Sequence, residues 1–217
     1  MIIDLHLNEK SVIIVGAGNE ALKRIKLLAT EGCEIIVIGE KPIAEITKLS
    51  QKKKITLKKI KITSTSFLKK YKPFLIIAST TDSILNQKIV QTAKKMKILA
   101  YASDSPDSSD ISYMSLIDIK KTIKVAISTS GSSPIMAKKI KSKTEKCLQK
   151  NISDQDIELI KIQKFARKES KKHILTQIER KKFLYELMND KRVKELLKDG
   201  KYKAIQTTIK KMVKDWK

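Results

Sequence analysis

The first half of the chain alternates between short apolar runs and longer amphipathic stretches. The apolar runs are Ser11–Val15, Glu34–Ile38, Ile55–Ile62, Phe74–Ser79 and Ile98–Ser103. Apolar residues recur at helical spacing between them, at Asn19–Glu31, Ile43–Leu49 and Asp82 to about Met96. Short β-branched runs are typical of buried strands, and their alternation with helices is typical of a parallel sheet covered on both faces. We therefore predict an α/β domain over residues 1–110.

The pattern changes after the fifth apolar run. A polar loop, SDSPDSSD, leads to two predicted strands, ISYMSLIDI and TIKVAIST, which the basic turn KKT joins. The segment SGSSP follows, and then a helix from Pro134 to about Leu148. From Asp154 onward the sequence is helical and rich in Lys and Glu, with one clear stop at Gly200. We predict a small β/α segment at 111–149 and a helical C-terminal domain at 150–217, without internal repeats.

The residues between the first predicted strand and helix, GAGNEA, fit the dinucleotide-binding pattern G-x-G-x-x-G/A. Gly16 permits the tight turn. Gly18 lets the backbone approach a pyrophosphate at the helix N-terminus, where free N–H groups and the helix dipole favour anions. Ala21 is small enough for the helix to pack closely on the strand. This context predicts a Rossmann-type fold with a bound dinucleotide; the alternative is a tight turn whose site is empty or takes another nucleotide.

An acidic residue follows the second predicted strand. Glu40 lies 22 residues after Gly18. A carboxylate at this place accepts hydrogen bonds from the adenosine ribose and repels a 2′-phosphate, so we expect NAD to be preferred over NADP. Lys41, beside it, weakens that preference.

Charge narrows the range of partners. The net charge is +24, yet only four of the 47 basic residues are arginine, and aromatic residues make up 5 %. Proteins that bind nucleic-acid phosphates usually favour arginine, because its planar fork binds them bidentately. The lysine excess therefore reflects either genome composition or an acidic partner such as nucleic acid, a membrane surface or a polyanionic small substrate. Residues 141–217 carry 23 basic and 11 acidic residues, which is half of the excess.

Several classes of site are excluded. Cys33 and Cys147 form no motif, and His6 and His173 are the only histidines, so neither a metal site nor a Ser–His–Asp triad can be assembled. No apolar run approaches the roughly 20 residues that span a bilayer. The first ten residues, MIIDLHLNEK, lack the basic-then-apolar order of a signal peptide. We expect a cytoplasmic protein with reduced thiols and no membrane partner.

Six stretches of the chain resemble, in the same order, the precorrin-2 dehydrogenases of the sirohaem pathway. The opening of that family is similar to VGAGNEALKRIKLL and GCEIIVIGE. Its A-T-D-D-x-x-x-N segment is similar to ASTTDSILNQKIV, and its D-x-P loop to SDSPDSSDISYM. Its I-S-T-G-G-x-S-P-x-L-A-[KR] run, the most specific of these features, is similar to VAISTSGSSPIMAKKIK, and its E-R-[RK]-x-F element to ERKKF.

The resemblance implies an NAD-dependent oxidation of precorrin-2 to sirohydrochlorin, and in some members the insertion of Fe²⁺ to give sirohaem. It also implies a homodimer that is joined through the middle segment. The family's catalytic aspartate falls on Asp104. Beside Gly16 and Gly18, the implied cofactor contacts are Asn19, Glu20, Glu40, Lys41 and Thr80.

The chain departs from the family pattern at five positions. Ala17 replaces a common middle glycine, and Thr81 replaces the first Asp of the A-T-D-D segment. Tyr101 stands where Asn is usual, Met114 where Pro is usual, and Ser130 where Gly is usual. We expect the last three to line the substrate side. These three substitutions do not contradict the dehydrogenase interpretation, but they concern how well the substrate fits and whether the protein has chelatase activity.

Asp104 follows the fifth predicted strand, where open α/β sheets bind ligands. Its carboxylate can accept the proton that leaves as hydride is transferred, take pyrrole protons, or guide Fe²⁺. The alternative is that Asp104 only begins a turn in SDSP.

The segment STSGSSP carries its own chemistry. Ser133 can cap the following helix, and Pro134 suits its first position. Exposed N–H groups and hydroxyls then form a surface that receives anions such as the carboxylates of precorrin-2. The substrate-binding candidates are Ser128, Thr129, Ser130, Ser132 and Ser133. The alternative is an ordinary capped helix with a flexible polar lead-in.

Two other functions are compatible with parts of the sequence. One is an NAD-sensing Rossmann module whose basic helical tail contacts nucleic acid, although no recognition-helix signature or aromatic platform is present. The other is an inactive relative that binds NAD without turnover. In the tail, apolar residues at helical spacing predict packing rather than ligand contact: Ile174, Ile178, Phe183 and Leu187.

Overall fold

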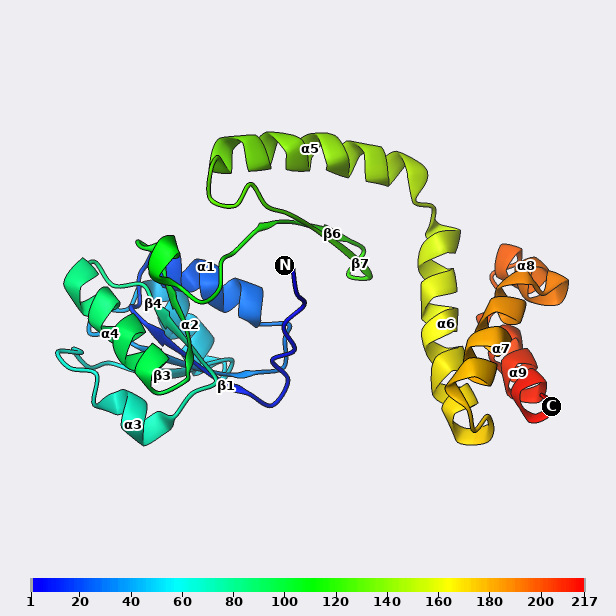
Figure 1. The fold of residues 1–217 in the computed structure, drawn as a ribbon, viewed down its shortest axis with the longest axis horizontal. Coiled ribbons are helices and arrows are strands. Elements are labelled where there is room, and N and C mark those ends of the chain that lie inside the picture. Colours follow the sequence, from blue (N-terminus) through cyan, green and yellow to red (C-terminus); the bar gives the residue numbers. More distant parts are fainter. Residues whose placement is uncertain (1, 217) are drawn as a thin grey trace. The chain divides into compact units, whose positions relative to one another are not determined.

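The structure, a computed structural model, describes residues 2–216. The chain forms two compact units, of which the first ends at Tyr113 and the second begins at Met114 (Figure 1).

The first unit contains a five-stranded parallel sheet. Its strands are β1 (Ser11–Val15), β2 (Glu34–Ile38), β3 (Thr56–Lys58), β4 (Leu75–Ala78) and β5 (Leu99–Ala102). The strand order is β3-β2-β1-β4-β5, and every neighbouring pair is parallel. This is the predicted Rossmann-type sheet. Strand β3 is shorter than predicted, because the Ile60 N–H bonds back to the Lys58 carbonyl at 3.0 Å and ends the ladder.

Helices cover both faces of this sheet (Figure 1). The helices are α1 (Asn19–Leu28), α2 (Ala44–Gln51), α3 (Phe67–Tyr71) and α4 (Ser83–Lys95). Helices α1 and α2 pack with Val12 and Ile14 of β1, and α3 and α4 pack with Ile13 and Val15. Because residues 12–15 of β1 are buried on both faces, this run is continuously apolar, as is typical of central parallel strands.

The strand order reverses between β1 and β4. From β1 the chain proceeds to β2 and β3 on one side, and from β4 to β5 on the other. In open α/β sheets this reversal leaves a crevice beyond the carboxyl ends of the two strands, where ligands bind. The glycine turn after β1 and the Ser79–Thr80 segment after β4 lie at that edge.

The second unit begins with an antiparallel hairpin of β6 (Ser115–Ile119) and β7 (Ile123–Ile127), followed by the long helix α5 (Pro134–Asn151). Lys120 and Lys121 form the turn with φ values of +51° and +55°. Positive φ at both positions is the geometry of a tight hairpin turn. The hairpin residues Ile117 and Ile119 pack with Ile157 in a small core.

Four helices complete the second unit. They are α6 (Asp154–His173), α7 (Gln177–Asn189), α8 (Lys191–Lys198) and α9 (Tyr202–Lys214). The sequence predicted only one helix end in this region, at Gly200. The structure has further breaks, because new helices also begin after Thr176 and Asp190. The side chains of these two residues accept hydrogen bonds from the Glu179 and Val193 N–H groups at 3.1 and 3.0 Å, as N-caps do.

The predicted packing of the tail is correct at three of four positions. Ile174, Phe183 and Leu187 lie in the core of the helical region. Ile178 is 71 % exposed, so its predicted packing role is wrong. It lies in the first turn of α7, before Phe183, the first buried residue of that helix. Within residues 2–216, none of the helices is both long and apolar enough to cross a bilayer.

Candidate functional site

The turn after β1 can be built only with glycine at residue 16. Gly16 has a φ of +115°, and a Cβ atom there would lie 2.4 Å from the Ser79 carbonyl oxygen. Its N–H donates to the Ile38 carbonyl at 2.8 Å. Gly16 therefore holds the ends of β1, β2 and β4 together at the edge where the crevice opens.

Gly18 has a different role. It is the N-cap of α1 in an extended conformation, and no side chain caps this helix. A Cβ atom at Gly18 would meet nothing within 4 Å. The first N–H groups of a helix have no partner inside the helix. Those of α1 have no side-chain cap, and the space beside Gly18 is open, so they are available to a phosphate.

The loop after β2 lies against the glycine turn. A Cβ atom at Gly39 would approach the Ala17 Cβ to 2.7 Å, and the Ile43 N–H donates to the Ala17 carbonyl at 3.1 Å. Gly39 immediately precedes Glu40 and Lys41, whose side chains are exposed. The predicted ribose-binding carboxylate is thus adjacent to the predicted pyrophosphate site.

Two predicted cofactor contacts lie in the first turn of α1. Asn19 is exposed at the start of the helix. The Glu20 carboxylate accepts a hydrogen bond from the Lys23 ammonium at 2.5 Å and lies 3.7 Å from Arg24. The hydrogen bond from Lys23 keeps the pKa of Glu20 below its ordinary value. The Glu20 side chain is therefore engaged within its own helix.

Thr80 belongs to a network around one buried amide. The Asn86 side chain is fully buried. Its oxygen accepts hydrogen bonds from the Thr80 N–H at 3.2 Å and from the Thr80 hydroxyl at 2.8 Å. Its NH₂ group donates to the Thr80 carbonyl at 3.1 Å and to the Asp104 carboxylate at 3.1 Å. One side chain of α4 therefore fixes both the end of β4 and the predicted catalytic aspartate.

This environment keeps Asp104 ionised. Partial burial raises the pKa of its carboxyl, but hydrogen bonds from Ser83 and Asn86 oppose burial, and the net pKa lies below the ordinary value. A partly exposed carboxylate that accepts such hydrogen bonds remains ionised, and so a proton acceptor, at neutral pH. Asn86 matches the Asn of the A-T-D-D-x-x-x-N segment, so the sequence drew attention to it, whereas Ser83 matches no defined position of that segment.

The rest of the polar loop has a structural role. The Ser109 hydroxyl accepts from the Ala102 N–H at 2.9 Å, and the Asp110 carboxylate accepts from the Ala100 N–H at 3.0 Å. These side chains supply the partners that an edge strand otherwise lacks. Asp107, in the short 3₁₀ helix Pro106–Ser108, is exposed.

Tyr101 lies in the core, so the expectation that it lines the substrate side is wrong. Its side chain is 5 % exposed and packs edge-to-face on Tyr113, with ring centroids 4.9 Å apart. Its hydroxyl accepts from the Arg24 guanidinium at 3.0 Å, and the same guanidinium lies 4.2 Å from the Tyr113 ring centroid. Side chains alternate along a strand, and residue 101 points to the α1 face of β5.

The STSGSSP loop precedes α5 in the second unit. The Ser133 hydroxyl accepts from the Met136 N–H at 3.2 Å, which is the predicted N-cap. The Thr129 hydroxyl donates to the Ser133 carbonyl at 3.2 Å, and Ser128 accepts from the Ser130 N–H at 3.0 Å. Ser132 is exposed, and its N–H bonds to the Thr129 carbonyl at 2.9 Å.

Ser130 adopts a left-handed conformation with a φ of +50°. Glycine adopts such a φ without a steric penalty, which explains why the family pattern has glycine there. Serine keeps the loop conformation at this position at a cost in backbone energy. Met114 begins the second unit and is half-buried.

The first unit thus contains a group of neighbouring features that fits a dinucleotide. An uncapped helix N-terminus, a bare Cα at Gly18 and an adjacent carboxylate at Glu40 match the pyrophosphate and the adenosine ribose. No group of three or more His, Cys, Asp or Glu side chains within residues 2–216 could hold a metal ion.

Comparison with known proteins gives the same assignment for the first unit. Residues 3–115 match the family described as putative NAD(P)-binding. The chain is 29 % identical over 144 residues to the precorrin-2 dehydrogenase of Bacillus subtilis, covering 66 % of this chain and 86 % of that protein. It is 29 % identical over 210 residues to a siroheme synthase of Buchnera aphidicola, covering 96 % of this chain and 42 % of that protein.

The chain spans less than half the length of the siroheme synthases that it matches, and only 29 % of the one from Nitrosococcus oceani. Among solved structures, a chain titled "SirC, precorrin-2 dehydrogenase" matches over the full length of both chains with a TM-score of 0.70 and 23 % identity. At that identity the match establishes a shared fold.

Proposed function

The chain belongs to the family described as putative NAD(P)-binding, and we propose that it is an NAD-dependent dehydrogenase that oxidises precorrin-2 to sirohydrochlorin. One observation carries the proposal most directly. A carboxylate kept ionised by Ser83 and Asn86 follows β5, and the same buried Asn86 fixes Thr80 at the crevice beside the glycine turn.

The glycine turn and its neighbours hold the cofactor. The N–H groups at the start of α1 bind the pyrophosphate, Gly18 gives it room, and Glu40 binds the adenosine ribose. When bound, NAD accepts the hydride that the substrate loses. Thr80 and the end of β4 lie at the same edge of the sheet as the glycine turn, where they would hold the rest of the cofactor.

Asp104 accepts the proton that the substrate loses with its hydride. The oxidation removes one hydride and one proton, so that precorrin-2 and NAD⁺ give sirohydrochlorin, NADH and H⁺. Its pKa lies below the ordinary value, so Asp104 is deprotonated at neutral pH and can accept this proton. The hydroxyls of Ser128, Thr129, Ser130, Ser132 and Ser133 are proposed to bind substrate carboxylates.

The insertion of Fe²⁺ is a second activity that the same carboxylate can support. Asp104 would accept the pyrrole protons that the metal displaces, with Fe²⁺ acting as a substrate. The names of the siroheme synthases that the chain resembles favour this step. No observation favours the nucleic-acid alternative.

An anaerobic assay tests the proposed function. We expect NADH to form with precorrin-2, and the absorbance of sirohaem to develop only after Fe²⁺ is added if the second activity is present. A protein that binds NAD but forms no NADH with precorrin-2 contradicts the dehydrogenase assignment.

Replacement of Glu40 should change cofactor preference. In the Glu40→Ser variant the ribose hydroxyls lose a charged acceptor and a 2′-phosphate is no longer repelled. We expect the preference for NAD over NADP to fall by about tenfold, since a charge-assisted hydrogen bond contributes about 1.5 kcal/mol or more. Dissociation constants measured by fluorescence titration check this. Glu45→Ser, an equal charge change at an exposed position of α2, should leave the ratio unaltered.

We also propose that the chain forms a homodimer through the hairpin and α5. A two-stranded hairpin alone is marginally stable in water and has open edges. Apolar side chains nearby are exposed, among them Leu116 at 37 %, Ile135 at 80 % and Ile140 at 40 %. A second copy would bury these side chains and pair the strand edges.

The Ile140→Glu variant tests the dimer. Because Ile140 is already partly exposed, the subunit should still fold, but the buried charge should raise the dimer dissociation constant by more than about tenfold. Analytical ultracentrifugation measures the change. Lys139→Glu, on an exposed neighbouring position, should have a smaller effect. Equal sedimentation of Ile140→Glu and the wild type would argue against this interface.

A further inference from the structure

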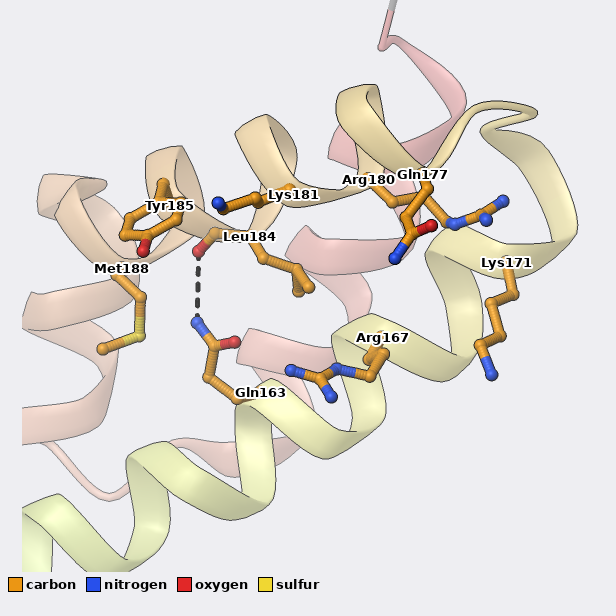
Figure 2. A pocket seen from close by; sticks show the side chains of 9 residues that line it. All are labelled: Gln163, Arg167, Lys171, Gln177, Arg180, Lys181, Leu184, Tyr185 and Met188. Carbon is orange, nitrogen blue, oxygen red and sulfur yellow. Dashed lines mark hydrogen bonds between the residues drawn. The ribbon is translucent and has the colours of Figure 1, made fainter.

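A cavity between α6 and α7 has no role in the reaction proposed above (Figure 2). Its volume is about 610 Å³, which lies within the range of roughly 300–1,000 Å³ that is usual for small-molecule sites. Arg167 and Lys171 line it from α6, and Arg180 and Lys181 line it from α7. We refer to it as the α6–α7 cavity.

The lining of this cavity is cationic and lacks acidic residues. Three of the four glutamates of these helices pair elsewhere: Glu158 with Lys161 at 2.6 Å, Glu169 with Lys172 at 2.7 Å, and Glu179 with Lys182 at 2.9 Å. The fourth, Glu186, is exposed and does not line the cavity. Within residues 2–216, none of the four lining cations forms an ion pair with a carboxylate. Their charge is left for an external anion.

Parts of the cavity wall are fixed before any ligand binds. The Arg180 guanidinium donates to the carbonyls of Ile174 and Leu175 at 2.8 and 2.9 Å, which orients its remaining N–H groups. At the other end, the Gln163 amide donates to the Leu184 carbonyl at 3.1 Å and ties α6 to α7, as the dashed line in Figure 2 shows. A wall that is held in this way loses less entropy on binding.

The lining also has an apolar part. Leu184 and Met188 are half-buried, and Tyr185 is 64 % exposed. In Figure 2 the Leu184 side chain extends from α7 towards Arg167 of α6. A ligand that satisfies the whole surface therefore has an apolar body with several anionic groups at its edge. Arginine matches carboxylates in particular, because its planar fork forms two parallel hydrogen bonds.

We propose that the α6–α7 cavity binds a polycarboxylate with an apolar body, the chemical class to which a carboxylate-rich tetrapyrrole belongs. The identification of that ligand with the substrate or product rests on the proposed function. Single-stranded nucleic acid fits less well, because its binding sites use several stacking aromatics along a cationic groove, and Tyr185 is the only aromatic residue in the lining.

Uroporphyrin serves as the probe because it is stable, fluorescent and rich in carboxylates. We compare two double variants of the full chain that carry the same charge change. Lys171→Gln with Lys181→Gln removes two cavity cations. Lys164→Gln with Lys168→Gln removes two exposed cations of α6 that do not line the cavity. Fluorescence anisotropy gives the dissociation constants, and thermal melts establish that each variant is folded.

We expect the cavity variant to bind uroporphyrin about tenfold more weakly, since two ion pairs at partly exposed sites together contribute about that factor. The control variant should bind as the wild type does, and added salt should weaken the binding.

Equal weakening of both variants, no weakening of either, or stronger competition by a single-stranded oligonucleotide than by coproporphyrin would overturn the inference. If the wild type forms NADH but the cavity variant binds porphyrin as tightly as the wild type does, the ligand assignment of the cavity fails and the dehydrogenase assignment stands. Selective porphyrin binding without NADH formation overturns only the dehydrogenase assignment.

Discussion

Replacement of Asp104 by Asn should lower the rate of NADH formation from precorrin-2 by about 100-fold to 10,000-fold, the usual contribution of a positioned general base. The amide has the same shape but cannot accept the proton. Asp104 is exposed, so the variant should fold and bind NAD as the wild type does. Stopped-flow absorbance under anaerobic conditions measures the rate.

The matched control for this variant is Asp107→Asn. Asp107 is an exposed carboxylate in the same loop, three residues further on, and it accepts none of the hydrogen bonds found at Asp104. Its replacement should leave the rate within about twofold of the wild type. If Asp107→Asn impairs the reaction as strongly as Asp104→Asn, the assignment of the base to residue 104 is wrong.

The pH dependence follows from the contacts of Asp104. Its pKa is low because hydrogen bonds from Ser83 and Asn86 favour the ionised form more than burial disfavours it. Activity should therefore persist into mildly acidic solution and fall as the pH drops through this lowered pKa. In Asn86→Ala one donor is lost, the pKa rises, and the acidic limb of the pH–rate profile should move to higher pH. An unchanged acidic limb in a folded variant would contradict this role.

The two glycines of the turn should respond differently to substitution. Gly18→Val should retain stability, because Gly18 has an extended backbone and open space around its Cα. The added side chain should overlap with the pyrophosphate, and such overlap costs roughly 1–3 kcal/mol. We therefore expect NAD binding to weaken by about tenfold to a hundredfold. Calorimetric titration with NAD gives the affinity.

Gly16→Ala should act mainly on stability. The added Cβ would lie 2.4 Å from the Ser79 carbonyl oxygen, and the φ of +115° is unfavourable for alanine. We expect the free energy of unfolding to fall by about 3 kcal/mol or more, which urea denaturation measures. The opposite pattern, in which Gly18→Val unfolds the protein and Gly16→Ala only weakens NAD binding, would contradict the geometry of the turn.

Much of the first unit could be predicted from the sequence because its strands are central and parallel. Burial on both faces forces continuous apolar runs, and β1 and β2 have the predicted bounds. The helix α3 could not be predicted, since it has five residues and only Leu68 is buried. The break before α8 was missed because Asp190 lies in a highly charged helical sequence, where one more charged residue gives no sign of a helix end. Only the structure shows that its carboxylate accepts the Val193 N–H as an N-cap.

The site was predicted less completely, because parts of it depend on spatial neighbours. The glycine turn and Asp104 belong to local motifs, whereas the contacts of Asn86 join α4 to the segments that follow β4 and β5. Tyr101 was misplaced because a resemblance in sequence does not tell which face of β5 a substituted side chain packs on. The α6–α7 cavity has no sequence motif, since it forms only when the lysines and arginines of two helices face one another.

The transfer of a labelled hydride tests the central claim most directly. Precorrin-2 that carries deuterium at the carbon to be oxidised is mixed anaerobically with NAD⁺ and the protein, and the nicotinamide product is analysed by mass spectrometry. The account predicts that each sirohydrochlorin formed is matched by one deuterated NADH, and that Asp104→Asn slows both together. Sirohydrochlorin formed without label in NADH, or no oxidation by a protein that binds NAD, would contradict it.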